Sequence, residues 1–518
     1  MFGIATIAIT APLFFLIILR IDALRSMFYS LLLVSGSSYF IWGMESEAVV
    51  ASSVQGMYKA TYIVVILFGA TILVHLLQQT KAIETIQQSF QSVSQDPRIY
   101  IVLIAFLFGS LIEGIAGFGT PVIIIGPLLV ALGFKPLSAA ALTLIANRTS
   151  SQFGAVGTPI FVGYSNVTEA STSYFQQLSF EIIMLDFVPT LLTPLLLIYL
   201  YNRFFASERK TMRPYIIWSL FIGLSYVLFS LLYVQFLGLE FVSILTPLTM
   251  IAIAVFTIKR GIFLPKSKYK VPLNFSRRQL IGAWSPYVVI VLLLGLTRLL
   301  PPVQETIQSL WRIEHRAIFG VEAIDGDLSI FYSPGIILLL AGLIGLIIQR
   351  QPLRLYQTAI QQSFRKVGKA ALTLYCTLML VQIFTNSFIN DNNLPSMPQY
   401  VADVMIGQFG RVWLFVAPFL GLLGTFITGG ATISTLTFAP IQENVAIDLS
   451  LPTKLILALQ MTGATTGTMV SINNVVTASA VLGLLGKEGQ VLLKTIIPAV
   501  LYLVFTTVCA YLILFIFE

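Results

Sequence analysis

The sequence Gly117-Phe118-Gly119-Thr120-Pro121 interrupts an apolar stretch that otherwise runs from Ile99 to Phe134. Glycine and proline break helices, and at membrane depth a break is tolerated only inside protein or beside a water-filled cavity. A second apolar stretch, Val412–Ala446, is interrupted in the same way by Thr428-Gly429-Gly430-Ala431-Thr432. The two interruptions therefore indicate two membrane segments that are not plain helices.

The composition places these segments in a membrane protein. The chain has 518 residues, of which 57% are hydrophobic and 10% are charged, and its mean hydropathy is +0.89. Soluble chains carry about 25% charged residues, so soluble enzymes, disordered tails and nucleic-acid binders are disfavoured despite the net charge of +8. Helices are expected because a bilayer cannot satisfy open backbone groups, and the alternation typical of a β-barrel is absent.

Few residues could hold a metal or a cofactor. The two cysteines, Cys376 and Cys509, lie in apolar segments, and His75 and His315 are the only histidines. We therefore expect no disulfide framework, no metal site and no cofactor. The chain lacks a GxxxxGK[ST] motif, so ATP-driven transport by this chain alone is unsupported. The spans show no nucleophile–base spacing, so the chain is not expected to be an enzyme.

Lysine and arginine cluster in particular loops, and this bias sets the orientation of a membrane protein. Glu45 and Glu47 are expected outside, as are the segments Ser165–Ser179 and Asn390–Asp403, which carry no Lys or Arg. Pro301–Ser333 is the one sizeable polar connection. Because its charges are mixed, the side of the membrane on which it lies is the least clear of all the loops. The basic residues expected inside are Arg20, Arg25, Lys81, Arg98, Arg203, Arg209, Lys210, Arg213, Lys259, Arg260, Lys266, Lys268, Lys270, Arg277, Arg278, Arg350, Arg354, Arg365, Lys366, Lys369, Lys487 and Lys494.

The two interrupted regions resemble copies of one another. Gly117 and Gly429 are 312 positions apart, as are Thr120 and Thr432. The first copy is entered from the inside, after Arg98, and six plausible spans separate the two outer loops. The second copy is therefore entered from the outside, and the two halves are predicted to be inverted repeats.

About 12 transmembrane helices are expected from segments near membrane length, the first of them an uncleaved span at Ile4–Leu19. We place the first repeat at residues 1–203 and the second repeat at residues 280–518. Residues 204–279 join them through two spans at Tyr215–Ile258.

Each interrupted region is followed by a second broken segment, Asn147–Pro159 in the first half and Thr462–Asn474 in the second. Matched interruptions in inverted halves are the best sequence indication of a secondary transporter's binding site. Helix N-termini at the breaks would direct N–H groups and a positive dipole end toward a common centre, which suits a carboxylate. Close packing of small residues would explain a single Gly or Thr, but explains the doubled arrangement less well. The substrate-binding candidates are Gly117, Gly119, Thr120, Asn147, Arg148, Thr149, Gly429, Thr432, Ser434 and Thr466.

Two charged residues lie within apolar segments near the breaks. Glu113 lies one turn before the first break, and burial favours the protonated form of a carboxyl group, so Glu113 is a candidate for proton coupling. Arg148 is the one basic residue in a broken segment, and its guanidinium could hold a substrate carboxylate. The structural alternatives are a fixed salt bridge, most simply between Arg148 and Glu113, or snorkelling to the interface. Asp186 lies near the start of a span, where an interfacial position is expected.

These motifs resemble a known family. Glu113-Gly-Ile-Ala-Gly-Phe-Gly-Thr-Pro121, followed by Ile145-Ala-Asn147 and Phe153-Gly-Ala-Val-Gly-Thr-Pro159, closely resembles the first signature of the L-lactate permease family. A second signature is partly present in Phe426-Ile-Thr-Gly429 and Gly483-Leu-Leu-Gly-Lys-Glu488. The resemblance implies uptake or exchange of L-lactate and related 2-hydroxy monocarboxylates such as glycolate, usually by proton symport.

The resemblance also implies re-entrant helical hairpins and an elevator-like movement. The expected fold is thus an all-α polytopic membrane protein with about 12 transmembrane helices and two hairpins, near residues 99–134 and 412–446. The expected location is the plasma (inner) membrane. The expected partners are a small monocarboxylate, a coupling proton and lipid, with no nucleic acid, and a homodimer is compatible with the sequence. The alternatives are a sodium-coupled carrier of another small carboxylate and, with less support, a passive anion channel.

The chain departs from the family pattern at three places. The family usually has Asn-Thr-Ala-Pro where this chain has Asn147-Arg148-Thr149-Ser150, and Gly-Ser-Asp-Thr where it has Gly429-Gly430-Ala431-Thr432. It usually has Gly-Lys-Met at Gly467-Thr468-Met469. An acid and a base of the second half are thus missing together, and a base appears in the first half. Our hypothesis is that Arg148 takes over the cationic role, facing Glu113 or the substrate carboxylate.

Overall fold

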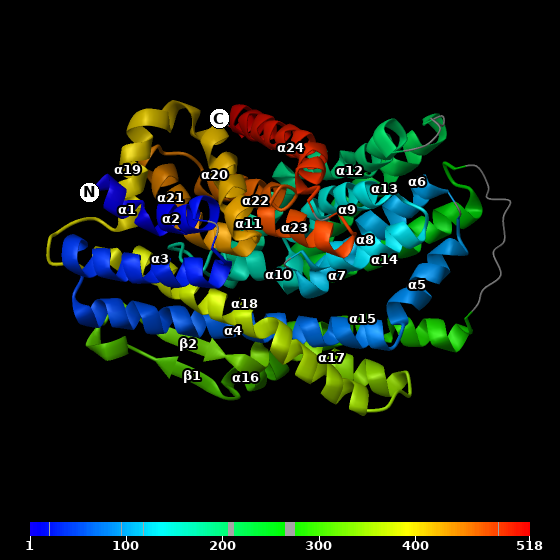
Figure 1. The fold of residues 1–518 in the computed structure, drawn as a ribbon, viewed down its shortest axis with the longest axis horizontal. Coiled ribbons are helices and arrows are strands. Elements are labelled where there is room, and N and C mark those ends of the chain that lie inside the picture. Colours follow the sequence, from blue (N-terminus) through cyan, green and yellow to red (C-terminus); the bar gives the residue numbers. More distant parts are fainter. Residues whose placement is uncertain are drawn as a thin grey trace.

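The computed structural model describes residues 1–19, 21–94, 96–117, 119–205, 212–264, 275–484 and 486–517 (Figure 1). Phe118, in the first interruption, lies outside these ranges. So do some of the basic loop residues assigned to the inner side, namely Arg20, Arg209, Lys210, Lys266, Lys268 and Lys270.

Helices make up almost all of the described chain, which confirms the all-α class. The described strands are β1 (Arg312–His315) and β2 (Gly326–Ser329), which pair antiparallel in a two-stranded sheet. Within the described ranges, nine helices are long and apolar enough to cross a membrane. The number is up to ten if α11 (Thr172–Leu185) and α12 (Phe187–Leu200), which meet at a 50° bend, count as one span.

Fewer helices reach membrane length than the roughly 12 expected from apolar segments, because the chain divides several of these segments. The predicted first span is split into α1 (Phe2–Ala5), α2 (Ile7–Leu13) and η1 (Phe14–Ile18). The next apolar segment consists of α3 (Ala23–Ser37) continued by η2 (Ser38–Trp42).

The two spans predicted at Tyr215–Ile258 are confirmed as α13 (Arg213–Phe236) and α14 (Leu239–Arg260). The repeat boundaries at residues 203 and 280 stay predictions. The remaining helices outside the broken segments are α5 (Ala82–Gln91), η4 (Tyr201–Phe205), α15 (Arg277–Leu299), α16 (Pro301–Ser309), η5 (Ile318–Gly320), η6 (Ile330–Tyr332), α17 (Pro334–Ile348), α18 (Arg354–Thr385), η7 (Asn386–Phe388), α19 (Met397–Phe409), η8 (Gly410–Val412) and α24 (Glu488–Phe517).

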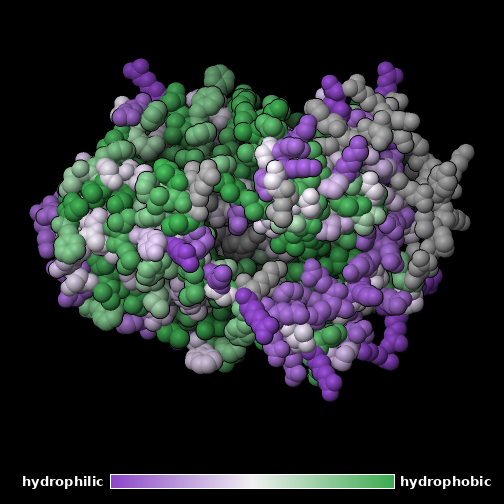
Figure 2. All heavy atoms as spheres, viewed as in Figure 1, coloured by the Kyte–Doolittle hydropathy of each residue, from purple (hydrophilic) through white to green (hydrophobic). Residues whose placement is uncertain are grey.

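The outer surface is apolar over wide areas. Figure 2 shows broad apolar areas on the visible face, with hydrophilic residues gathered toward one side of it. Large exposed side chains include Phe40, Phe236, Leu292 and Phe515. Soluble monomers rarely expose contiguous apolar patches of this kind, whereas a lipid-facing surface requires them. The chain is therefore a multi-pass membrane protein.

Long helices form one layer, along the lower side of Figure 1. Helix α4 (Ser46–Gln79) packs along both α18 and α17. The contact with α17 is close, because a Cβ atom on Gly69 would meet the carbonyl oxygen of Gly335. Small residues of this kind let membrane helices approach backbone to backbone. The hairpins and broken helices lie above this layer in the same view.

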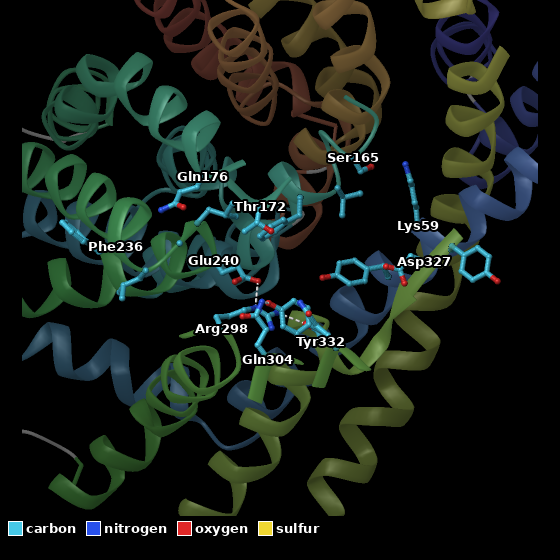
Figure 3. Close-up of a pocket in the computed structure, with 18 residues that line it drawn as sticks. Lys59, Ser165, Thr172, Gln176, Phe236, Glu240, Arg298, Gln304, Asp327 and Tyr332 are labelled. Carbon is cyan, nitrogen blue, oxygen red and sulfur yellow. Dashed lines mark hydrogen bonds and ion pairs between the residues drawn. The ribbon is translucent and has the colours of Figure 1, made fainter. Parts of the chain in front are cut away.

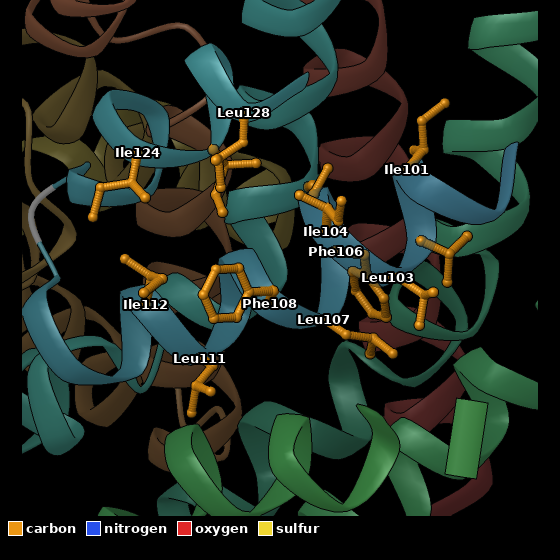
Figure 4. Close-up of a cluster of buried hydrophobic side chains, with 14 of the residues drawn as sticks. Ile101, Leu103, Ile104, Phe106, Leu107, Phe108, Leu111, Ile112, Ile124 and Leu128 are labelled. Carbon is orange, nitrogen blue, oxygen red and sulfur yellow. The ribbon is translucent and has the colours of Figure 1, made fainter. Parts of the chain in front are cut away.

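The first interruption forms the tip of a helical hairpin, hairpin 1. Its elements are α6 (Pro97–Tyr100), η3 (Ile101–Phe108), α7 (Gly109–Ala116) and, after the tip, α8 (Thr120–Ala131). Gly117 and Gly119 have φ values of +60° and +74°, which glycine adopts without strain. The first arm is enclosed by protein along its whole length, among apolar side chains such as Phe106 and Phe108 (Figure 4).

The second interruption forms the tip of hairpin 2. Its arms are α20 (Trp413–Thr428) and α21 (Ala431–Asp448), and Gly429 at the tip has a φ of +80°. Between the arms and α22 (Thr453–Gly467), the Gln442 amide donates to the Gln460 side chain at 3.0 Å. Both hairpins predicted from the sequence, near 99–134 and 412–446, are thus confirmed.

The two further broken segments are confirmed as well. In the first half, α9 (Pro136–Ser151) ends before α10 (Gly154–Phe161), and Ala155, Val156 and Gly157 of α10 have positive φ values. In the second half, α22 ends at Gly467 and α23 (Ile472–Val481) begins four residues after Thr468. Each half therefore contributes one hairpin tip and one broken helix.

The structure also assigns the side of the Pro301–Ser333 connection. One cavity is lined both by Ser165 and Thr172 and by Gln304 and Tyr332, so this connection lies on the same face as the Ser165–Ser179 loop. The distribution of Lys and Arg predicts that this face is the outer one.

The contact between α20 and α22 gives a test of the packing. A Cβ atom on Gly463 would meet the Pro418 carbonyl oxygen, which is backbone and cannot move aside. We expect Gly463→Ala to lower the free energy of unfolding by about 1–3 kcal/mol, as overpacking does. The measurement is thermal unfolding of the purified protein in detergent. Gly368→Ala is the control, because no atom lies within 4 Å of the added Cβ; equal stability of both variants would contradict the packing described.

Candidate functional site

The tips of both hairpins and both broken helices meet at one small cavity, the central cavity. Its volume is about 20 Å³, which is room for a single water molecule. Residues from the two halves of the chain contribute to it. They are Glu113, Gly117, Gly119, Ser151, Gly154, Ala155, Pro159, Gly429, Gly430, Ala431, Thr432 and Thr468.

Two helices begin at this cavity without a side-chain cap. Helix α8 begins at Thr120 after Gly119, and α21 begins at Ala431 after Gly430; neither preceding residue caps its helix. The first N–H groups of a helix lack partners within the helix and carry the positive end of its dipole. By contrast, the nearby α23 is capped by the Ser471 hydroxyl, which accepts from the Asn474 N–H at 3.2 Å. The cavity is therefore suited to an anion.

Glycine is required at the hairpin tips because they press against other broken segments. A Cβ atom on Gly119 would lie 2.6 Å from the Asn474 side-chain oxygen, and one on Gly429 would lie 2.9 Å from Cβ of Asn473. Both asparagines belong to α23, so one helix contacts the tips of both hairpins. The Asn474 amide also donates to the Thr468 carbonyl at 3.0 Å, which fixes the break that follows α22.

Glu113 is the one acidic residue among the described residues that line the central cavity. Its side chain is 3% exposed, and it lies beside the Asn147 side chain and the Gly119 backbone. One of its oxygens, Oε2, has no hydrogen-bond partner in the described part of the chain. A Cβ atom on Gly154 would lie 2.9 Å from the other oxygen. A buried carboxyl group with an unpaired oxygen is a candidate for proton exchange or for contact with a ligand.

Arg148 does not face Glu113 or the central cavity. Its guanidinium forms an ion pair with Asp186, and both side chains are buried, with exposures of 0% and 1%. The Arg148 Nε donates to the Thr466 hydroxyl at 3.3 Å, and the guanidinium carbon lies 4.6 Å from the ring centre of Tyr502. The simplest sequence expectation for a salt bridge, Arg148 with Glu113, is thus wrong.

The interfacial position expected for Asp186 is also wrong. The bend between α11 and α12 places this residue inside the protein, where it also accepts a hydrogen bond from Thr190 at 2.7 Å. The reason is electrostatic: a buried guanidinium is costly to leave unpaired, and Asp186 supplies its counter-charge. The sequence indicates that a membrane-embedded arginine needs an acid nearby, but it does not single out Asp186 among the carboxylates.

The other predicted substrate residues fall into two groups: those at the central cavity and those away from it. Gly117, Gly119, Gly429 and Thr432 line the central cavity. Asn147 lies beside Glu113, and Thr120 begins α8 next to the tip.

The remaining hydroxyls hold helices together away from the cavity. Thr149 pairs with Thr193 at 3.4 Å, and Ser434 donates to the Gly421 carbonyl at 2.7 Å between the arms of hairpin 2. Thr466 donates to the Thr462 carbonyl at 2.7 Å and accepts from Arg148. These three residues are at most 2% exposed.

Comparison with known proteins identifies the family of this chain. A family model described as L-lactate permease matches residues 2–517. The chain belongs to the L-lactate permease family. Its relatives include the L-lactate permease of Bacillus subtilis, which is 27% identical over 88% of this chain and 85% of the relative. The L-lactate permease of Salmonella typhi is 26% identical over 98% and 95% of the two chains.

A third relative carries a different substrate name. The glycolate permease GlcA of Escherichia coli is 26% identical over 86% of this chain and 82% of its own. Among solved structures, the YdaH transporter of Alcanivorax borkumensis aligns with a TM-score of 0.45 and 14% identity, covering 87% and 85% of the two chains. As an L-lactate permease family member with membrane-length helices, the chain is a multi-pass permease of the plasma membrane.

The Arg148–Asp186 pair gives a test in this permease. Removing one partner of a buried ion pair strands a charge and costs about 3–5 kcal/mol, whereas replacing both by apolar residues costs far less. We therefore expect Arg148→Met and Asp186→Leu each to be strongly destabilising and the double variant to be more stable than either. The readout is a double-mutant cycle from thermal unfolding in detergent; additive losses would show that the two side chains do not interact.

Proposed function

We propose that this permease carries L-lactate and related 2-hydroxy monocarboxylates such as glycolate across the plasma membrane together with protons. The names of the relatives support this substrate class. The observation that carries the proposal is that two uncapped helix N-termini, of α8 and α21, meet a buried carboxyl group, Glu113, at one cavity.

The substrate carboxylate would bind at the hairpin tips. The N–H groups at the start of α21 would donate to its oxygens, and the dipoles of α8 and α21 would stabilise its charge. At the start of α8, Thr120 and Val122 donate to the carbonyls of Gly117 and Gly119 and Pro121 has no N–H, so this helix would act through its dipole. Thr432 lines the cavity and has a hydroxyl for the carboxylate or for the substrate 2-hydroxyl. Gly117, Gly119 and Gly429 would let the ligand approach the backbone closely.

Glu113 would couple the substrate to a proton. Two carboxylates in one desolvated cavity repel, so only one of them stays charged at a time. A bound substrate anion therefore favours a proton on Glu113, and release of the anion favours release of that proton. Substrate and proton would then cross together, and the loaded site would gain no net charge from them.

Transport also requires the central cavity to open. Its present volume of about 20 Å³ cannot hold a monocarboxylate, so the structure corresponds to a closed site. The hairpin tips are the elements that close it, since Gly117 and Gly119 line one wall and Gly429 and Gly430 another. We infer that a hairpin tip, or the body that carries it, moves to admit substrate from each side in turn.

Uptake by proteoliposomes tests the substrate and the coupling ion. We expect labelled L-lactate to accumulate above equilibrium when an inward proton gradient is imposed, and to be competed by glycolate. Sodium is varied separately. Accumulation that depends on sodium alone would replace proton symport by sodium symport, and flux that never exceeds equilibrium would favour a passive channel.

Glu113→Gln tests the coupling role. The amide keeps the shape of the side chain but binds no proton, so we expect loss of proton-driven accumulation with retention of L-lactate exchange across the membrane. Glu47→Gln is the control, because Glu47 is exposed and lies far along the chain from either hairpin. Proton-driven accumulation that is unchanged in Glu113→Gln would exclude Glu113 as the proton carrier.

A further inference from the structure

A second and much larger cavity opens on the outer face. Its volume is about 600 Å³, and we call it the outer vestibule. Its walls come from α4, from the end of α10 and the loop after it, from the ends of α11, α13, α14 and α15, and from the Pro301–Ser333 connection (Figure 3). The polar residues that matter below are Lys59, Thr172, Glu240, Arg298, Asp327 and Tyr332.

Most charges in the outer vestibule are already paired. Arg298 donates to Glu240 at 2.7 Å and to the Tyr332 carbonyl at 2.7 Å, and its guanidinium carbon lies 3.5 Å from the Tyr332 ring centre. Asp327 accepts two hydrogen bonds from Arg312, each of 3.1 Å. These groups compensate one another and leave little charge for a ligand.

Lys59 differs from them. Its ammonium donates to the side-chain oxygen of Asn166, which is a neutral acceptor. Among the described residues, no carboxylate oxygen lies within 4.0 Å of the Lys59 ammonium, the distance that defines an ion pair. Asn166 is itself held by Gln382, which donates to the same oxygen at 3.2 Å, and by Thr385 at 3.4 Å. Lys59 is therefore a half-buried cation fixed in place by amides rather than neutralised by an acid.

The outer vestibule and the central cavity share helix α10. Phe161 and Val162 line the vestibule, while Pro159 and Ala155, earlier on the same helix, line the central cavity. Only one residue lies between Pro159 and Phe161. The vestibule thus ends at α10, which also forms one wall of the closed central cavity. A ligand that enters from outside would bind in the vestibule before this wall moves.

We propose that Lys59 forms an outer capture site for the monocarboxylate, where the substrate anion binds from outside before the central cavity opens. The identity of the ligand rests on the proposed function; the anion selectivity of the vestibule does not. The Lys59 ammonium has three donors, one of which is used by Asn166. The others can bind a carboxylate by charge-assisted hydrogen bonds.

The first test measures transport from each side separately. In right-side-out vesicles, Lys59→Gln should raise the KM for external L-lactate roughly tenfold, the loss expected for one charge-assisted hydrogen bond, with the maximal rate unchanged. In inside-out vesicles the KM should stay the same, because the capture site faces only outward. Lys59→Arg should retain the low KM. A change of maximal rate in both directions would indicate a structural role and overturn the proposal.

Lys454→Gln is the matched control for loss of positive charge on the outer face. Lys454 lies near Glu169 and Glu443 around a different cavity, and it too donates to a neutral amide, that of Gln177, at 2.5 Å. We expect this variant to keep the KM of the unsubstituted protein. An equal rise in KM for Lys454→Gln would show that only the general surface charge matters.

A labelling experiment tests the vestibule without transport. Cys376 and Cys509 are first replaced by alanine, and Thr172, which is exposed and lines the vestibule, is replaced by cysteine. An anionic methanethiosulfonate reagent should then react faster than a cationic one of similar size, and Lys59→Gln should remove the difference. Equal rates with Lys59 present would overturn the capture site. Failure of L-lactate uptake by the unsubstituted protein, with the anion preference intact, would overturn the proposed substrate instead.

Discussion

The structure depends on one constraint: a helix that breaks within a membrane must find protein partners for its freed backbone groups or place them against a cavity. Four of the breaks in the described chain meet at the central cavity. The hairpin tips need glycine because Asn473 and Asn474 of α23 press against them. Helix α23 begins at this position because the Ser471 side chain caps its N-terminus. The uncapped ends of α8 and α21 face the same cavity, and their positive dipole ends favour an anion there.

The Arg148–Asp186 pair does not line the central cavity, but it holds the broken helix α9 in place. Arg148 belongs to α9, Asp186 to the bend between α11 and α12, Thr466 to α22 and Tyr502 to α24. One guanidinium thus ties the broken helix of the first half to that of the second. A buried pair contributes little net stability over an apolar core, but it fixes register, since any shift of α9 against the α11–α12 bend strands a charge. Helix α9 and this bend are therefore expected to move as one body.

The local features of this architecture could be predicted from sequence, and the long-range ones could not. The breaks at Gly117 and Gly429 follow from the conformational preferences of glycine and proline, so both hairpins and both later breaks were predicted correctly. The partner of Arg148 could not be predicted. Asp186 lies 38 positions away, and its apolar neighbours do not show how deeply it is buried. The outer vestibule was missed for the same reason: Lys59, Asn166 and Gln382 come together only through tertiary packing.

Under the proposed function, the two cavities correspond to one stage of alternating access. The outer vestibule is wide and the central cavity is closed, and α10 lines both. At this break Ala155, Val156 and Gly157 already have positive φ values, and the first two of these carry a Cβ that makes such a conformation strained. Strain stored at the boundary between the cavities lowers the cost of rearranging that boundary. An anion held at Lys59 would then need only a local movement of α10 and the hairpin tips to reach the N-termini of α8 and α21, while the Arg148–Asp186 pair keeps α9 in register with the α11–α12 bend.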